Sequence, residues 1–219
     1  MKDIVITSDS TCDLSADLLT ANEIAIMPLS VMLGDRTYKD GIDIVPSDIF
    51  RYVDETGELP KTAAPSVEEY ERFFRSFTNE GKTVIHFNIS SKASGSHGFA
   101  LAAAQKIGGS RVYVVDSHAL STGQGLLVLK ACDLREAGKS AAQIYQTVLS
   151  LREKVNTSFI PDTLLYLYKG GRCSTLSYSE EKVYRQNDSL HSFLYQRSCC
   201  SLSELRQNAL FRHAQQCRL

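Results

Sequence analysis

A run of hydroxyl and small residues at positions 90–96 (SSKASGS) offers the clearest binding chemistry in this sequence. It follows a stretch rich in β-branched and aromatic residues, 83–89, and it opens an apolar, helix-forming stretch, 99–104. A helix start has free backbone N–H groups and a partial positive charge, which together favour a carboxylate or phosphate group. The run holds no obvious acid, base or metal ligand. It therefore predicts anion binding rather than catalysis.

An aspartate directly after the first predicted strand raises a second possibility. Asp9 stands where a phosphotransfer enzyme could place a phosphoryl-accepting carboxylate, with magnesium nearby. Such sites usually carry a second carboxylate two residues later, and that position is Thr11 here. The alternative is a turn whose Asp9 and Ser10 side chains satisfy local backbone groups. Because a lone aspartate is a weak signal, the turn is the favoured interpretation.

Two further polar groups allow both a functional and an ordinary structural interpretation. A serine hydrolase elbow would need glycine at position 92, which is Lys92, so Ser94 and His97 do not predict a hydrolase. His97 is expected on a helix surface or lining a pocket. Arg172 follows two glycines and could pair with a carboxylate or phosphate on a ligand or partner. A surface arginine after a helix end fits that pattern equally well.

The segments that would position these residues alternate between strands and helices. Strands are predicted at 4–6, 24–27, 29–33, 83–89, 112–115 and 157–160. Helices are predicted at 14–21, 67–80, 123–137 and 141–155, and one more runs from the turn at 90–96 to residue 107. This alternation predicts an α/β fold with a mainly parallel sheet flanked by helices. Ligands in such sheets bind beyond the carboxyl ends of the strands. Three polar turns fall at such ends, so they would converge on one crevice if their strands are neighbours: 8–13, 90–96 and 116–121.

Local signals refine this pattern between the first strand and the central one. Asp13 or Ser15 is predicted to cap the helix at 14–21, and Ser47 is predicted to cap a further helix. A hairpin turn is predicted at 34–35 and a proline-bounded loop at 60–65. Ser66 and Glu69 are predicted to form a capping box. The aromatic face of the helix after that box, from Tyr70 to Phe77, is predicted to be core.

Bulk composition narrows the class of protein. The chain has 219 residues, 43% of them hydrophobic and 22% charged, with a formal net charge of −1. This charge gives no electrostatic reason to expect nucleic acid, and no apolar stretch is long enough to predict stable insertion in a membrane. A strand begins almost at the first residue, so no signal peptide is expected and a cytoplasmic location is predicted. None of the six cysteines forms a Cys-x-x-Cys pair, and Cys132 is predicted to be a core residue.

Several segments, taken in order, resemble one family, the DegV proteins. They are 6–14 (ITSDSTCDL), 28–29 (PL), 38–41 (YKDG), 61–66 (KTAAPS), 90–96 (SSKASGS), 115–117 (VDS) and 170–172 (GGR). The fourth segment is similar to the family's Thr-Ser-x-Pro-Ser loop and the fifth to its Ser-Ser-x-Leu-Ser-Gly-Thr turn. The order and spacing of these segments carry the resemblance more than any one motif does.

The resemblance implies a lipid-binding protein rather than an enzyme. Such a protein would bind a long-chain fatty acid in an apolar tunnel between two α/β domains, with no cofactor, and present it to the ATP-binding subunit of a separate fatty-acid kinase. The residues that match the family's carboxylate-binding positions are Thr62 and Ser94. Supporting or partner-facing positions are matched by Ser10, Ser91, Gly95 and Arg172.

The resemblance ends near position 174, where composition shifts to a polar run and a basic tail. We therefore expect a DegV-like α/β domain with the head-group site at 1–155 and an incomplete or aberrant second domain at 156–219. The hypothesis is that a frameshift or truncation has replaced most of that domain and impairs binding. Two alternatives remain open at this point: a phosphotransfer enzyme that uses Asp9, and an interaction domain without a ligand.

Overall fold

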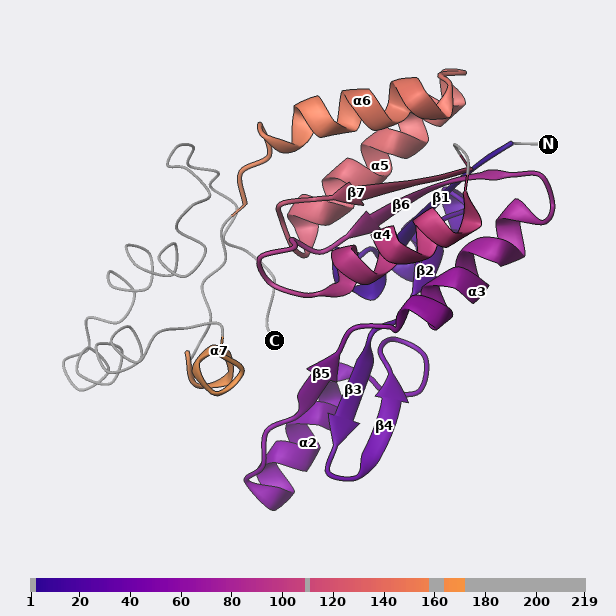
Figure 1. Cartoon of the computed structure of the whole chain (residues 1–219). Helices are drawn as coiled ribbons and strands as arrows, with labels where there is room; N and C mark the ends of the chain where they lie inside the picture. The colour runs from indigo at the N-terminus through magenta and orange to yellow at the C-terminus, as the bar shows by residue number, and fades with distance from the viewer. Residues whose placement is uncertain (1–2, 109–110, 158–163, 172–219) are drawn as a thin grey trace.

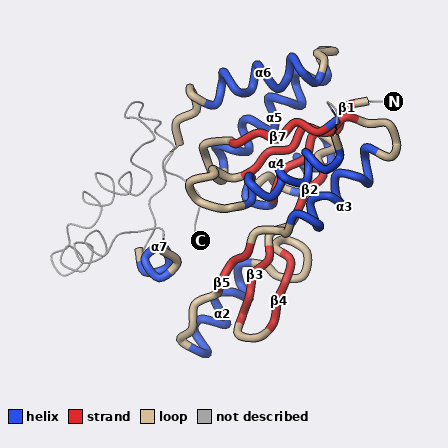
Figure 2. The backbone as a smooth tube through the Cα atoms, viewed as in Figure 1, coloured by secondary structure: helices blue, strands red, loops and turns tan. Residues whose placement is uncertain are grey.

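The computed structural model of the protein describes residues 3–108, 111–157 and 164–171. Its centre is a parallel sheet of four strands in the order β2-β1-β6-β7 (Figures 1 and 2). The strands are β1 (Ile4–Asp9), β2 (Ala25–Met27), β6 (Thr83–Asn88) and β7 (Val112–Asp116). This arrangement confirms the predicted α/β fold with a mainly parallel sheet.

Helices cover both faces of this sheet (Figure 1). On one face α5 (Thr122–Glu136) and α6 (Ala141–Arg152) pack on Ile6, Ile85 and Phe87. On the other face α3 (Val67–Thr78) and α4 (Ser96–Ile107) pack on Val84 and Val114. Because successive strand residues point to opposite faces, a strand covered on both sides must be apolar at nearly every position. Tyr70 and Phe74 of α3 and Cys132 of α5 are buried in these clusters, which confirms them as core.

A second, smaller sheet lies beside the main body, with α2 (Pro46–Thr56) packed next to it (Figure 2). It is antiparallel, in the order β4-β3-β5, with β3 (Ser30–Leu33), β4 (Arg36–Lys39) and β5 (Lys61–Ala63). The hairpin turn at 34–35 is confirmed. The loop predicted at 60–65 is wrong for residues 61–63, which pair with the free edge of β3 and satisfy its backbone groups.

Helix starts test the predicted caps. Ser66 and Glu69 form the expected capping box of α3, and Ser15 rather than Asp13 caps α1 (Ala16–Ala21). Ser47 does not cap α2, which already begins at Pro46. A proline fits the first helical position because its missing N–H would be unpaired there anyway, and Asp48 accepts the Val45 N–H at 3.2 Å.

The part of the chain that would form a second domain is largely outside this description. Beyond Thr157 the structure describes one short helix, α7 (Leu165–Lys169). The strand predicted at 157–160 lies outside the described residues apart from Thr157, and so do Arg172 and nearly all of the region 156–219. Among the described residues no helix is both long and apolar enough to cross a membrane.

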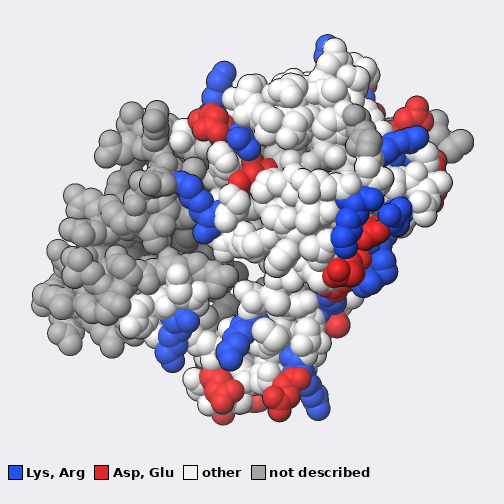
Figure 3. Space-filling model, in the orientation of Figure 1, with Lys and Arg blue, Asp and Glu red and all other residues white. Residues whose placement is uncertain are grey.

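Charged side chains of both signs are mixed on the visible surface of the described residues (Figure 3). Lys106 of α4 forms an ion pair between neighbouring helices, because its Nζ lies 3.7 Å from carboxylate oxygens of both Glu68 and Glu71 of α3. Exposed pairs of this kind contribute little to stability.

Candidate functional site

The three polar turns predicted to converge do meet at one edge of the parallel sheet. The strands β1, β6 and β7 are adjacent, and their carboxyl ends are Asp9, Asn88 and Asp116. Backbone hydrogen bonds join the turns that follow. Ser90 N donates to Ala119 O at 2.8 Å, and Ser121 N donates to Thr11 O at 2.9 Å.

The hydroxyl turn at 90–96 is tightly folded around Ser90. The backbone amides of Ala93 and Ser94 both donate to Ser90 O, at 2.8 and 3.2 Å. The half-buried Ser94 hydroxyl lies 2.9 Å from Ser96 Oγ and accepts the Ser96 N–H at 3.3 Å. Ser94 thus takes one free amide of the first turn of α4, as a helix cap does.

The start of α4 keeps further donors available. Within the described residues, the backbone N–H groups of His97 and Gly98 have no hydrogen-bond acceptor. The first turn of α4 has no acidic residue, and Gly95 precedes it in an ordinary right-handed conformation. Free amides beside a hydroxyl at a helix start form an arrangement that suits a carboxylate.

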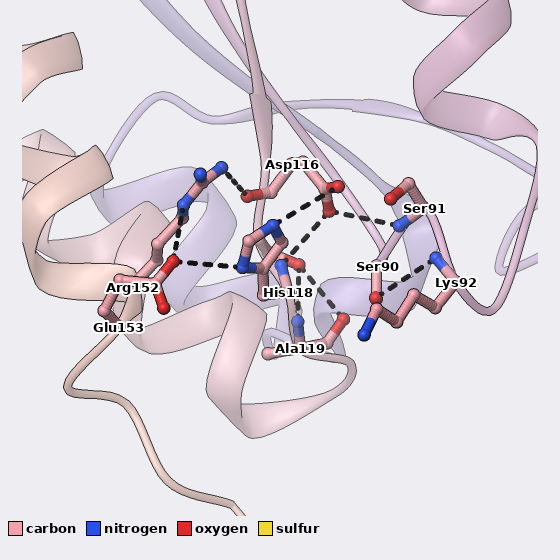
Figure 4. Close-up of polar contacts among 9 residues, drawn as sticks. Ser90, Ser91, Lys92, Asp116, His118, Ala119, Arg152 and Glu153 are labelled. Atoms are coloured by element: carbon pink, nitrogen blue, oxygen red, sulfur yellow. Dashed lines mark hydrogen bonds and ion pairs between the residues drawn. The ribbon is translucent and has the colours of Figure 1, made fainter. Parts of the chain in front are cut away.

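Asp116 fastens this turn to the end of β7 (Figure 4). Its Oδ1 accepts the backbone N–H groups of Ser91 at 3.1 Å and His118 at 3.2 Å. Burial alone would raise the pKa of Asp116, but these hydrogen bonds outweigh burial and hold the pKa below its usual value. Asp116 is therefore ionised and fixes the outer part of the turn.

Charged groups from the end of α6 complete the cluster in Figure 4. The His118 ring lies between two carboxylates, with Nε2 3.6 Å from Asp116 Oδ2 and Nδ1 3.2 Å from Glu153 Oε1. Arg152 Nη1 donates to the backbone carbonyl of Asp116 at 3.0 Å. The end of β7 is thus held from both the turn and α6.

Asp9 is a structural residue in this arrangement. It is 0% exposed, and its oxygens accept hydrogen bonds from Thr11 Oγ1 and Gln124 Nε2, each at 2.6 Å, and from Ile89 N at 2.8 Å. Burial raises the pKa of Asp9 above its usual value, and these hydrogen bonds offset only part of that rise. A phosphoryl group cannot reach a carboxylate so enclosed, so the structure opposes Asp9 as a nucleophile.

Sequence reasoning did not foresee a buried polar network below the turns. His86 and Asn88 of β6 are fully buried, as are Thr7 of β1 and Gln124 of α5. His86 Nδ1 lies 2.8 Å from Thr7 Oγ1, and Asn88 Nδ2 lies 3.0 Å from the Tyr70 hydroxyl. The sequence does carry one signal of this network, because His86 and Asn88 stand two positions apart in an otherwise apolar central strand.

The other predicted site residues fall in different places. Ser10 lies in the short 3-10 helix after β1, where its hydroxyl accepts the N–H of Leu29, a residue of the connection between β2 and β3, at 3.2 Å. Thr62 lies on β5 of the small sheet, exposed, opposite Val31. Ser91, Ser94 and Gly95 share the turn. The structure thus groups three of these residues directly, with Ser10 at the neighbouring strand end, while Thr62 comes from a different sheet.

His97 lies in the first turn of α4, half-buried, as its predicted position on a helix surface or beside a pocket requires. Its Nδ1 is buried and has no hydrogen-bond partner among the described residues. Burial is the main cause that lowers its pKa, and the nearby Asp116 opposes that shift.

The sequence that forms this sheet and turn is similar to that of known proteins. A family model described as an uncharacterised protein of the DegV family matches residues 3–178. A DegV domain-containing protein of Clostridium acetobutylicum is 34% identical over 174 residues, which cover 80% of this chain and 62% of that protein.

Solved structures give the same result. A Thermus thermophilus protein described by its fatty acid binding is 37% identical, with a TM-score of 0.71 over 78% of this chain and 61% of that one. A stearic acid-binding protein from Eubacterium ventriosum is 31% identical, with a TM-score of 0.67 over 78% of this chain and 60% of that one. The chain spans about three fifths of the length of these relatives.

Proposed function

The chain belongs to the DegV family, and from this premise we propose that it binds a long-chain fatty acid through the turn at 90–96. One observation carries the proposal. At the start of α4, the Ser94 hydroxyl stands beside the backbone N–H groups of His97 and Gly98, which have no acceptor among the described residues. A fatty-acid carboxylate supplies the acceptor oxygens that such a group of donors requires.

The proposal assigns the carboxylate to two hydroxyls, Ser94 and Thr62. Ser94 stands on the carboxyl edge of the parallel sheet, where ligands of open α/β sheets bind. Thr62 is exposed on β5 and belongs to the segment that leads directly into α3. Support for the ligand comes from two relatives described as binding a fatty acid, one of them stearic acid.

We further propose that the chain is not a catalyst but presents its bound acid to the ATP-binding subunit of a fatty-acid kinase, in the cytoplasm. The enclosure of Asp9 supports a binding role, because this candidate phosphoryl acceptor is buried and hydrogen-bonded within the core. In this scheme Ser91 and Gly95, both exposed on the turn, support the head group or face the partner. Arg172 is proposed for the same role.

The experiment that tests this function uses the full chain purified from expressing cells. Lipids are extracted under denaturing conditions and identified by mass spectrometry, and the stripped protein is titrated with stearate. We expect about one long-chain fatty acid per chain and saturable binding of stearate. Protein that carries no fatty acid and does not bind stearate contradicts the proposal.

A further inference from the structure

The two hydroxyls proposed to hold the carboxylate come from different sheets, so contacts between these parts of the molecule set their separation. Ser94 follows β6 of the parallel sheet, whereas Thr62 lies on β5 of the small antiparallel sheet (Figure 2). The chain after β5 leads through the buried Pro65 into α3, which packs on the parallel sheet. A contact that fixes the small sheet to the start of α3 therefore also fixes Thr62.

Lys39, the last residue of β4, makes such a contact. Its Nζ donates to Glu69 Oε1 of α3 at 2.8 Å and to Ser30 Oγ of β3 at 3.0 Å. The side chains of Lys39 and Glu69 are 34% and 29% exposed, so the ion pair is partly shielded from water. The hydrogen bond from Lys39 is the largest cause that holds the pKa of Glu69 below its usual range. The hairpin of the small sheet is thus joined directly to the first turn of α3.

Glu69 connects this contact to the chain that leaves β5. Its other carboxylate oxygen, Oε2, accepts the backbone N–H of Ser66 at 2.9 Å. In return, Ser66 Oγ accepts the backbone N–H of Glu69 at 3.2 Å. Ser66 lies in the short connection between β5 and α3. One carboxylate thus holds the small sheet through Oε1 and the end of the β5 connection through Oε2.

The strand register places this ion pair on the face of the small sheet opposite Thr62. Ser30 pairs with Lys39 on one side and with Ala63 on the other. Directly opposed residues point to the same face of a sheet, whereas neighbours along a strand, such as Ala63 and Thr62, point to opposite faces. Lys39 is therefore not placed to touch a ligand that Thr62 holds, and it acts on the site through the position of β5.

We infer that Lys39 is a positioning residue, whose ion pair with Glu69 holds β5 so that Thr62 and Ser94 bind one carboxylate together. This inference rests on the proposed function. Two donors that are held in place before the ligand arrives bind it more tightly than two donors that must first be ordered. Without the ion pair, Thr62 should contribute less to binding, while the contribution of Ser94 remains.

The test measures the dissociation constant of stearate for delipidated full-length chains. Lys39→Met removes the ammonium group and keeps an unbranched side chain, and it should fold because partly exposed ion pairs contribute little to stability. Glu69→Gln removes the charge of the partner but keeps a side-chain oxygen for Ser66, since glutamine also serves in a capping box. The matched control is Lys106→Met, because Lys106 of α4 pairs with Glu71 of the same helix, α3, at 3.7 Å.

We expect the dissociation constant to rise about fivefold in Lys39→Met and in Glu69→Gln, and to stay unchanged in Lys106→Met. In a Thr62→Ala background, which itself weakens binding, Lys39→Met should have no further effect, because the hydroxyl that it positions is already absent. Wild-type affinity in a folded Lys39→Met protein overturns the inference. An equal loss with and without the Thr62 hydroxyl also overturns it, since that result indicates a general weakening of the fold.

Failure of the inference can be distinguished from failure of the proposed function. A wild-type chain that does not bind stearate contradicts the proposed function itself, and the inference fails with it. A wild-type chain that binds stearate, together with undiminished binding by Lys39→Met, overturns only the positioning role. If Lys39→Met does not fold, Glu69→Gln is compared with wild type in the same two backgrounds, because it breaks the ion pair from the other side and keeps the helix cap.

Discussion

The Asp116 carboxylate accepts the backbone N–H of Ser91 at 3.1 Å, so the end of one strand holds the turn that follows its neighbour. This contact makes the shape of the head-group turn depend on a residue that touches no ligand in our account. The same oxygen accepts the His118 N–H at 3.2 Å, so both segments are fixed by one ionised group.

Replacement of that group should loosen the turn. We expect Asp116→Ala to lower the free energy of unfolding by about 1–3 kcal/mol, because two partly buried backbone N–H groups, those of Ser91 and His118, lose their acceptor. Stearate affinity should fall as well, since Ser94 lies in the loosened turn. Chemical denaturation and stearate titration measure the two effects. Asp133→Ala, at an exposed position on α5, is the matched control, and equal stability of the two variants would refute the role of Asp116.

Two glycines provide a paired test of packing next to the site. A Cβ added to Gly125 of α5 would lie 2.8 Å from the backbone oxygen of Cys12 and 3.0 Å from Leu14 Cδ2, whereas one added to Gly98 of α4 meets nothing within 4 Å. We expect Gly125→Ala to destabilise the protein by about 1–3 kcal/mol through overpacking. Gly98→Ala should stabilise it by up to about 1 kcal/mol, the helix propensity difference. Thermal unfolding measures both effects, and a shift of the melting temperature in the same direction for both variants would contradict this expectation.

Acid should destabilise the fold through His86. Burial lowers the pKa of this histidine to about 3, from the ordinary histidine value of 6.5. Between these values the unfolded chain binds a proton that the folded one does not, so this contribution to stability is complete above pH 6.5 and falls as the pH decreases toward 3. The slope for one proton is at most about 1.4 kcal/mol per pH unit.

The difference between wild type and His86→Gln isolates this contribution. Asp9, whose pKa is raised by burial, titrates in both proteins, so its effect is shared. Denaturant unfolding between pH 4 and pH 7 should show a steeper loss of stability in the wild type than in the variant. Parallel pH profiles would show that His86 is not the buried neutral group described here.

The sequence was sufficient to predict the parallel sheet and the convergence of its polar turns. Apolar runs such as 112–115 mark buried strands, and adjacent parallel strands end at the same edge. It was not sufficient for β5, because the three residues 61–63 carry no strand signal and become a strand by pairing with β3. The Tyr70–Asn88 contact was also beyond reach, since a tyrosine at helical spacing reads as core and its hydroxyl partner lies 18 residues away.

The turn at 90–96 could be predicted from neighbouring residues in the sequence. The side chains from other elements that hold this edge of the sheet in place could not. Ser94 and Ser96 interact across two positions of sequence, so spacing alone predicts their proximity. Asp116, at the end of another strand, accepts a hydrogen bond from Ser91. Gln124, on a helix 115 residues later in the sequence, donates one to Asp9. Such contacts depend on which strands are neighbours in the sheet, and the sequence alone did not determine that order.

The most direct test of the central claim is the affinity of stearate for wild type and Ser94→Ala, measured by isothermal titration calorimetry on delipidated full-length chains. Ser150→Ala serves as the control, because Ser150 is exposed on α6 and donates only to Thr147 O among the described residues. We expect a loss of about 1–3 kcal/mol of binding free energy for Ser94→Ala, the value of one hydrogen bond to a charged group, and no change for Ser150→Ala. Equal stearate affinity in wild type and Ser94→Ala would contradict the claim that this hydroxyl holds the fatty-acid carboxylate.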